Sequence, residues 1–485
     1  MRAGPASFKG ATASKAARFF LVDNGVDIQP VSRHIQTPTH VYATFGVGPC
    51  SSLRFAPGVR PCAPQALKGP TNMSMNRRQF LSSTAATAAS ATLMGLAGTR
   101  AFAAGEEKIN VAAIYDLSGG LDIYGKPVMD ALRFAAEEVN ARGGLLGKQL
   151  NFIAYDAQSN MQLYAQFAQQ AALRDKAAVV HAGITSASRE VVRPVLNRYR
   201  TLYFYDNQYE GGVCDRNYFA AGVTPAQTVQ KLAPYAVKKW GKKVYIVAAD
   251  YNYGQIVSNW VRKYAADAGG TTVATEFFPL DVTDFGAAIS KIQAASPDFI
   301  WSALVGGAHM SFYRQWKATG MTDKIPLAST TFAGGNEHIV LSPEECNGFL
   351  VCQNYLQELP GAANADFVKR FHARYGANYP YITELAMGAY QGFMLWAEGV
   401  RKAGSVDRMK VIEALESGIA IDAPSGRVTL DPATHHCTLD VHIAEVRDRK
   451  LNLVESYPQQ QPGDTAAVCD LIKNPADNRQ YAIKF

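Results

Sequence analysis

The sequence predicts an α/β protein built as two doubly wound lobes that are joined by several crossings of the chain. From Lys108 onward, apolar strand-like runs alternate with amphipathic helical stretches, which is typical of a parallel sheet flanked by helices. The same alternation restarts after Thr224-Pro225, and a chain of 485 residues is too long for one compact core. Two sheets, and therefore two lobes, are expected.

The first lobe is expected to contain four strands separated by three helices. Each strand is a short apolar run, and each helix carries apolar residues at helical spacing. The predicted strands are 109–115, 150–155, 178–183 and 201–205, and the predicted helices are 127–139, 161–174 and 188–199.

The second lobe is expected to begin with a helix that ends at Lys239 and to continue with five strands. Three helices then follow without strands between them, and helices of this kind need a sheet to cover. We therefore expect 104–228 and 356–425 to form lobe 1, and 229–355 and 426–485, with a Pro/Gln-rich tail, to form lobe 2. The predicted strands are 243–248, 271–277, 298–305, 326–330, 348–355, 427–430 and 440–446, and the late helices are 366–375, 383–403 and 407–418.

The distribution of charge excludes a nucleic-acid partner. The formal net charge is +7, but residues 1–103 hold 11 of the 48 Lys and Arg residues and only two of the 41 Asp and Glu residues. The remainder carries 37 basic and 39 acidic side chains, a net charge of −2. A body so nearly neutral lacks the basic surface that binding to phosphates requires.

The basic N-terminal part contains a pattern typical of export. Asn76-Arg77-Arg78-Gln79-Phe80-Leu81 precedes an Ala-rich apolar run over 81–97 and then Ala101-Phe102-Ala103, a small-x-small cleavage site. The pattern resembles a twin-arginine signal peptide, although Asn76 and Ser82 depart from it. We expect residues 75–103 to be this signal, translation to begin at Met73 or Met75, residues 1–74 to be a non-native upstream extension, and the mature protein to be periplasmic.

The cysteines predict at most two disulfides in the exported part. Five of the seven cysteines follow the leader, so they cannot all pair within one chain. Cys346 and Cys352 are spaced to close a short loop, and the other pairings stay open. His435-His436-Cys437 lacks a spaced partner motif and is expected to form a surface turn instead of a metal site. No metal and no cofactor are expected.

Catalytic motifs are absent from the sequence. It holds no Gly-x-Ser-x-Gly, no His-Glu-x-x-His and no Walker loop. The glycine-rich run 143–147 follows a predicted helix and precedes a strand, so a tight turn is expected there and not a phosphate loop. An amidase would need an activated nucleophile, and Cys214 has no motif around it. We therefore expect a binding protein and not an enzyme.

Polar and aromatic side chains gather where predicted strands end. Open α/β sheets bind ligands at the carboxyl ends of their strands. In the first lobe the loops at 184–189 and 205–212 follow the third and fourth strands, and in the second lobe Asp250-Tyr251-Asn252-Tyr253-Gly254 follows the first strand. These loops are expected to face one cleft from both lobes, and a hinge of several crossings suits closure on a ligand.

Residues 108 to about 460 resemble the periplasmic solute-binding proteins of ABC transporters, in the branched-chain amino-acid receptor superfamily. The motifs Gln208-Tyr209-Glu210-Gly211 and Asp422-Ala423-Pro424-Ser425-Gly426 are similar to those of the urea and short-chain amide binders, a branch that includes an amide sensor. The resemblance is also carried by 140–148, a segment common to the whole superfamily, and by 185–189, Asp250-Tyr251 and 427–431.

The resemblance implies a ligand site and a membrane permease as partner. Ile184 and the pair Asp206-Asn207 depart from the branch. The ligand-contacting positions match Tyr124, Ser186, Tyr205, Asn207, Gln208, Tyr251 and Tyr253.

A small neutral polar solute such as urea or an amide fits these side chains, since hydroxyls and amides pair with it without burying a charge. An amino acid is the alternative: Ser186 would then face its carboxylate, and Asp206, Asp250 or Glu210 its ammonium. An amide-sensing regulatory protein is the alternative of a different class.

Overall fold

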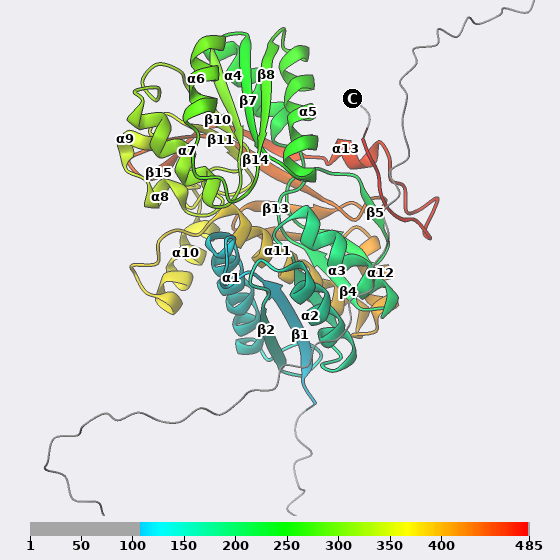
Figure 1. Ribbon diagram of the computed structural model, residues 1–485. Helices are drawn as coiled ribbons and strands as arrows, with labels where there is room; N and C mark the ends of the chain where they lie inside the picture. Colours follow the sequence, from blue (N-terminus) through cyan, green and yellow to red (C-terminus); the bar gives the residue numbers. More distant parts are fainter. Residues whose placement is uncertain (1–106, 484–485) are drawn as a thin grey trace, which may run out of the picture. The chain divides into compact units, whose positions relative to one another are not determined.

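The computed structural model describes residues 107–483, so the predicted upstream extension and signal peptide lie outside the described residues. The described chain forms two α/β lobes, each a sheet with helices on both faces, as the sequence predicts (Figure 1). Among residues 107–483, no helix combines the length and the apolar character needed to cross a membrane.

Lobe 1 is built around a five-stranded parallel sheet in the order β2-β1-β3-β4-β6. Helices α1 and α11 pack against one face of this sheet, and α2 and α3 pack together on the other. The side chain of Asn160 caps α2, and Thr185 caps α3. The elements are β1 (Ile109–Tyr115), α1 (Asp122–Ala141), β2 (Leu150–Asp156), α2 (Met161–Leu173), β3 (Val179–Ala182), α3 (Ser186–Arg198), β4 (Leu202–Tyr205), β5 (Val213–Asp215) and β6 (Tyr218–Ala220).

Lobe 2 is built around the parallel run β8-β7-β9-β10-β11, which β14 extends in the antiparallel sense. Helices α4 and α5 pack together on one face, while α6 and α7 contribute to the core on the other. The elements are α4 (Val229–Trp240), β7 (Lys243–Ala249), α5 (Asn252–Asp267), β8 (Thr271–Phe278), α6 (Gly286–Ala295), β9 (Phe299–Ala303), α7 (Gly307–Ala318), β10 (Leu327–Ser329), α8 (Glu337–Val340), α9 (Pro343–Cys346) and β11 (Leu350–Gln353).

After β11 the chain crosses to lobe 1 and then returns. The Tyr375 hydroxyl of α10 donates to the carbonyl of Asp130 on α1, and α11 packs along α1. Two short strands then join the edge of the lobe 2 sheet through β14. The elements are α10 (Ala362–Tyr375), α11 (Glu384–Ala403), α12 (Arg408–Glu416), β12 (Ala420–Ala423), β13 (Gly426–Leu430) and β14 (Cys437–Arg447).

The C-terminal segment differs from the predicted tail of lobe 2. Its first part is the strand β15 (Lys450–Gln460), which pairs with β14. After α13 (Gly463–Ala466) the chain reaches lobe 1, where β16 (Asn478–Gln480) pairs with β5, close to the labels α13 and β5 in Figure 1. We call residues 461–483 the C-terminal strap. β16 and β5 are far apart in the sequence, and no local sequence pattern in the strap predicts that they pair.

The predicted pairing of Cys346 with Cys352 is wrong. Cys214 and Cys469 form the disulfide, and Cys346, Cys352 and Cys437 are free, buried thiols. Cys352 points into the core on one face of β11, whereas Cys346 packs in the core on the opposite face. Because side chains alternate across a strand, the sheet itself lies between the two sulfur atoms.

The tract His435-His436-Cys437 forms a turn, but the prediction that it lies at the surface is wrong. Both histidines are fully buried against lobe 1. The His435 ring stacks on Phe219 at 4.2 Å, and His436 hydrogen-bonds to the hydroxyl of Tyr209. The tract therefore fastens the start of β14 to lobe 1.

Candidate ligand-binding site

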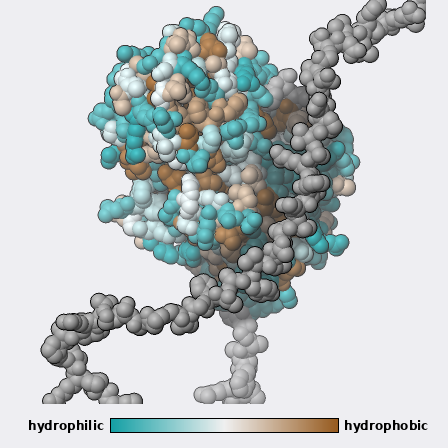
Figure 2. Space-filling view, in the orientation of Figure 1, coloured by the Kyte–Doolittle hydropathy of each residue, from teal (hydrophilic) through white to brown (hydrophobic). Residues whose placement is uncertain are grey.

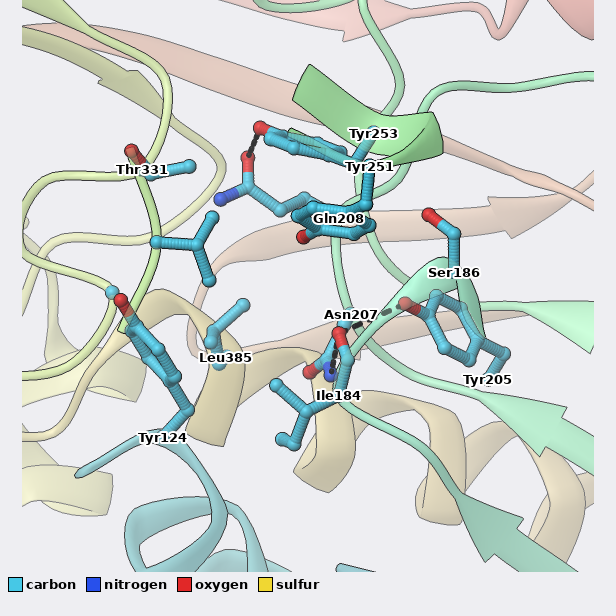
Figure 3. A pocket seen from close by; sticks show the side chains of 12 residues that line it. Tyr124, Ile184, Ser186, Tyr205, Asn207, Gln208, Tyr251, Tyr253, Thr331 and Leu385 are labelled. Carbon is cyan, nitrogen blue, oxygen red and sulfur yellow. Dashed lines mark hydrogen bonds between the residues drawn. The ribbon is translucent and has the colours of Figure 1, made fainter. Parts of the chain in front are cut away.

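A pocket lies between the two lobes, and all seven residues singled out from the sequence line it (Figure 3). It encloses a space of about 40 Å³. Figure 2 shows apolar residues at the surface where the lobes meet, around the level of this pocket. The lining residues are Tyr124, Ile184, Ser186, Tyr205, Asn207, Gln208, Tyr251, Tyr253, Val305, Thr331, Gly334 and Leu385.

Nearly every lining residue follows the carboxyl end of a parallel strand. Lobe 1 supplies residues after β1, β3 and β4, and lobe 2 supplies residues after β7, β9 and β10. This is the edge at which open α/β sheets bind ligands, because the loops there converge. The exception is Leu385, which comes from the first turn of α11.

A Tyr-Gly pair positions one tyrosine of each lobe. Gly125 follows Tyr124 and Gly254 follows Tyr253, each in the first turn of its helix. A Cβ at Gly125 would lie 1.9 Å from a main-chain oxygen at the end of β1, and one at Gly254 would lie 2.0 Å from the oxygen of Ala249. Only glycine allows the helix to approach the strand so closely, and this approach brings the tyrosine to the pocket.

The lobe 1 wall of the pocket presents hydrogen-bond acceptors. The Tyr205 hydroxyl donates to the carbonyl of Ile184 at 3.1 Å, and Asn207 Nδ2 donates to the carbonyl of Gly183 at 2.7 Å. The hydrogens of both side chains are therefore engaged by the main chain. Asn207 Oδ1 is buried without a partner, so it remains free to accept a hydrogen bond.

Ser186 is also engaged as a donor. Its hydroxyl donates to Glu210 Oε2 at 2.6 Å, and Glu210 Oε1 accepts from Arg189 at 2.8 Å. The Arg189 and Glu210 side chains are both almost fully buried, at 0% and 1% exposure. An ion pair thus lies directly behind the serine, outside the pocket lining.

Two hydrogen bonds join the lobes across the pocket. The main-chain N–H of Gly306 in lobe 2 donates to the Tyr124 hydroxyl at 3.0 Å, and the Tyr253 hydroxyl donates to Gln208 Oε1 at 3.4 Å. The ring of Tyr251 stacks beside that of Tyr253, as Figure 3 shows. The structure is therefore a closed form, and Gln208 keeps its amide hydrogens available for a ligand.

None of the twelve lining side chains carries a formal charge. Burial raises the pKa of Tyr205 and of Tyr253, so both hydroxyls are neutral at physiological pH. Two carboxyl groups lie behind the lining, where burial raises the pKa of Glu337 to about 7 and that of Glu384 to about 8.

The three acidic residues considered for an amino-acid ammonium do not line the pocket. Asp206 accepts from Tyr115 at 3.1 Å and is hydrogen-bonded to His181 at 2.9 Å, within lobe 1. Asp250 accepts from the side chain of Gln255, and Glu210 is engaged as described above. None of these three carboxylates could therefore balance an ammonium in the pocket.

Sequence reasoning missed the contributions of Val305, Thr331, Gly334 and Leu385. The first three follow strands β9 and β10, so they too lie at the carboxyl ends of strands, where ligands bind. They carry few polar atoms, however, and the sequence analysis selected loops by their polar and aromatic side chains. Leu385 belongs to a helix that returns from elsewhere in the chain, and no local signal marks it.

The described residues offer little for catalysis or metal binding. Within residues 107–483 no group of three or more His, Cys, Asp or Glu side chains could hold a metal ion. The sulfur of Cys214 is part of a disulfide and is not a free nucleophile. The arrangement can enclose a small solute, orient it by hydrogen bonds and release it when the lobes part.

Two α/β lobes that close over a pocket lined by strand-end loops define a two-lobed solute-binding protein. The chain belongs to the periplasmic binding protein family, whose family model matches residues 108–450.

Named relatives and a solved structure agree with this family. A Leu/Ile/Val-binding protein homolog of Brucella melitensis is 26% identical over 230 residues, 46% of this chain, and the chain spans only 57% of that relative's length. A leucine-, isoleucine-, valine-, threonine- and alanine-binding protein of Pseudomonas aeruginosa is 23% identical over 350 residues, covering 70% of this chain and 90% of the relative. A solute-binding protein of an ABC transporter from R. palustris, solved with 4-hydroxybenzoate, shares the fold with a TM-score of 0.66 and 24% identity, covering 73% of this chain and 98% of that one.

Proposed function

We propose that this protein is the periplasmic substrate-binding component of an ABC transporter, and that it captures urea, a short-chain amide or a related small polar solute by closure of its lobes. The loaded, closed form would deliver the solute to a membrane permease without breaking a bond. The observation that carries the proposal is the uncharged lining of the pocket between the lobes.

The absence of charge from the lining favours a neutral ligand. A buried charge without a partner costs several kcal/mol, and both an amino acid and an aromatic acid bring at least one. The acids that would have balanced an ammonium are bonded elsewhere: Asp206 to Tyr115, Asp250 to Gln255, and Glu210 to Arg189. A neutral amide has no charge to balance.

The hydrogen-bond pattern favours a ligand with N–H groups and one carbonyl. Ser186 and Tyr205 have their hydrogens engaged by other groups, so they face the ligand as acceptors, and Asn207 Oδ1 is a third acceptor. Gln208 supplies amide hydrogens for a carbonyl, because its oxygen already accepts from Tyr253. Urea and primary amides carry the complementary set of donors and acceptor.

The size of the pocket favours a small ligand. In the closed form about 40 Å³ is open to the centres of water-sized groups, which favours a solute of few non-hydrogen atoms.

A branched-chain or other amino acid is the second candidate. The apolar side chains of Ile184, Val305 and Leu385 line the pocket, and the P. aeruginosa relative is named for binding leucine, isoleucine and valine. Amino-acid capture would need a more open pocket and a partner for the ammonium.

A regulatory amide sensor is the candidate of a different class. It would share the fold but stay in the cytoplasm, so cell fractionation separates it from an exported receptor.

A thermal-shift screen tests the proposal. Ligands that bind only the folded state raise its melting temperature by mass action. Urea, formamide and acetamide are expected to stabilise the protein at millimolar concentration, whereas leucine and 4-hydroxybenzoate are not. Stabilisation by leucine or 4-hydroxybenzoate alone would replace the proposed ligand class.

A further inference from the structure

We propose that Glu210 sets the ligand specificity of this pocket by fixing the direction of the Ser186 hydroxyl hydrogen; this rests on the proposed function. The Ser186 hydroxyl lies 2.6 Å from Glu210 Oε2, and both side chains are buried. A carboxylate can only accept hydrogen bonds, so the single hydrogen of the serine must point to Glu210 and away from the pocket.

The consequence concerns which ligand atoms Ser186 can contact. With its hydrogen engaged, the serine oxygen offers only lone pairs to the pocket. An amide N–H can donate to these lone pairs, whereas a carboxylate oxygen meets another acceptor with no hydrogen between them. The serine therefore discriminates between an amide and the carboxylate of the same shape, and Glu210 is the residue that imposes the choice.

Arg189 is the positioning residue that pairs with Glu210 and fixes the place of its carboxyl group. It donates to Glu210 Oε1 at 2.8 Å, and its guanidinium lies 4.6 Å from the ring centroid of Tyr209 and 5.3 Å from that of Tyr205. Glu210 and Glu190 together balance this buried cation. Without Glu210, less negative charge lies behind Ser186, which favours anionic ligands.

The C-terminal strap holds the loop that carries this pair. Gln480 accepts from Arg189 at 2.7 Å and donates to the carbonyl of Gly211 at 2.9 Å, and Thr465 accepts from the main-chain N–H of Gly212 at 3.0 Å. The C-terminal strap, which belongs to neither main sheet, therefore holds the loop that follows Glu210. Because the loop is held in this way, the buried ion pair can keep one geometry when the lobes move.

The test compares acetamide with acetate, which have the same shape, on the purified full chain by titration calorimetry. The measured quantity is the ratio of the two affinities. In Glu210→Gln the serine hydrogen is released and the guanidinium is unbalanced, so acetamide binding weakens, acetate binding strengthens and the ratio falls by about tenfold or more. An unchanged ratio in a folded Glu210→Gln variant overturns the proposal.

Glu190→Gln is the matched control. Glu190 also accepts a hydrogen bond from Arg189, at 2.9 Å, but it does not contact Ser186. Its removal alters the charge around the same guanidinium but leaves the Ser186 hydrogen engaged by Glu210, so the ratio is expected to fall much less than in Glu210→Gln. A fall in the ratio as large as that of Glu210→Gln would show a general charge effect and contradict the role of the serine hydrogen.

Two further variants keep the test decisive. Where Glu210→Gln does not fold, Arg189→Met with Glu210→Met replaces it, because this pair removes both charges and leaves no side-chain acceptor for the serine hydrogen. Ser186→Ala is expected to lower the ratio by itself, and Glu210→Gln on that background is expected to change it little, because the two residues act through one hydrogen bond. A wild-type ratio in Ser186→Ala, or fully additive effects of the two substitutions, overturns the proposal.

Failure of the proposed function is seen separately. If the wild-type protein binds no amide, the proposed function fails before the role of Glu210 is tested.

Discussion

Removal of the disulfide between Cys214 and Cys469 is expected to destabilise the whole protein and to loosen the loop behind the ligand site. The two cysteines are separated by 255 positions, and β16 of the strap pairs with β5, the strand that contains Cys214. For a closed loop of this length the chain-entropy relation gives a stabilisation of about 5 kcal/mol at 25 °C. Native disulfides usually contribute about 2–4 kcal/mol, so the expected loss lies in the range of about 2–5 kcal/mol.

The assay is unfolding by guanidinium chloride, followed by tryptophan fluorescence, for the wild type and the double variant Cys214→Ala with Cys469→Ala. Urea is avoided as the denaturant because it is a proposed ligand. The midpoint is expected to fall in the variant, and a reducing agent should lower the wild-type midpoint without affecting the variant. Cys352→Ala serves as the control, since it removes a buried thiol that cross-links nothing. Equal midpoints for the oxidised wild type and the double variant would refute the reasoning.

The same variant should also show where the strap acts. The main-chain N–H of Gly212 donates to Thr465 in the strap, so its hydrogen exchange is expected to accelerate when the cross-link is lost. Amides of β1, an interior strand of the lobe 1 sheet, should keep their protection relative to the global stability. Equal acceleration at both places would show that the strap has no local effect.

Three further predictions concern the pocket and its supports. Tyr205→Ala and Tyr251→Ala should each abolish stabilisation by acetamide in a thermal-shift assay while circular dichroism still shows a folded protein; retained stabilisation in both would remove these residues from the site. Gly254→Ala should destabilise the protein in thermal unfolding, because its Cβ would lie 2.0 Å from a main-chain oxygen at the end of β7, whereas Gly307→Ala, with no atom within 4 Å, should be nearly neutral or stabilising. Burial raises the pKa of Glu384 from its ordinary 4.5 to about 8. Between these two pH values the folded state holds a proton that the unfolded state has released, so the free energy of unfolding falls as the pH rises. Glu384→Gln should therefore gain melting temperature relative to wild type from pH 5 to pH 8, and a difference that does not change with pH would contradict this.

The sheets and the pocket follow from local patterns, and for that reason they could be predicted. Each parallel strand is a short apolar run that is bounded by helix-forming sequence, as in Ile109–Tyr115, whose predicted and observed bounds agree. Ligand-facing loops follow the carboxyl ends of such strands, which pointed to the loops after β3, β4 and β7, and the family resemblance added Tyr124 after β1. All seven chosen residues line one pocket.

The features that escaped prediction depend on contacts between distant parts of the chain. The disulfide joins Cys214 to Cys469, and neither neighbourhood indicates the other. His435 and His436 read as a polar turn, yet lobe 1 buries both and supplies Phe219 and Tyr209 as their partners. Likewise, the sequence alone allows the Ser186 hydroxyl to donate to a ligand carboxylate, whereas the structure shows that Glu210 takes its hydrogen. Sequence patterns predicted which loops meet, but not how a hydroxyl within them is oriented.

A calorimetric titration of the wild-type protein with acetamide and with acetate tests the proposed ligand class most directly. Both compounds have four non-hydrogen atoms, so the best efficiency of very small ligands caps the affinity near about −6 kcal/mol, a Kd of about 40 μM. Because the pocket lining is uncharged and Ser186, Tyr205 and Asn207 face it as acceptors, acetamide is expected to bind one site in the range of tens of micromolar or weaker, and acetate is expected to bind the same site at least tenfold more weakly. Tighter binding of acetate than of acetamide would contradict the proposal that this pocket selects neutral amides.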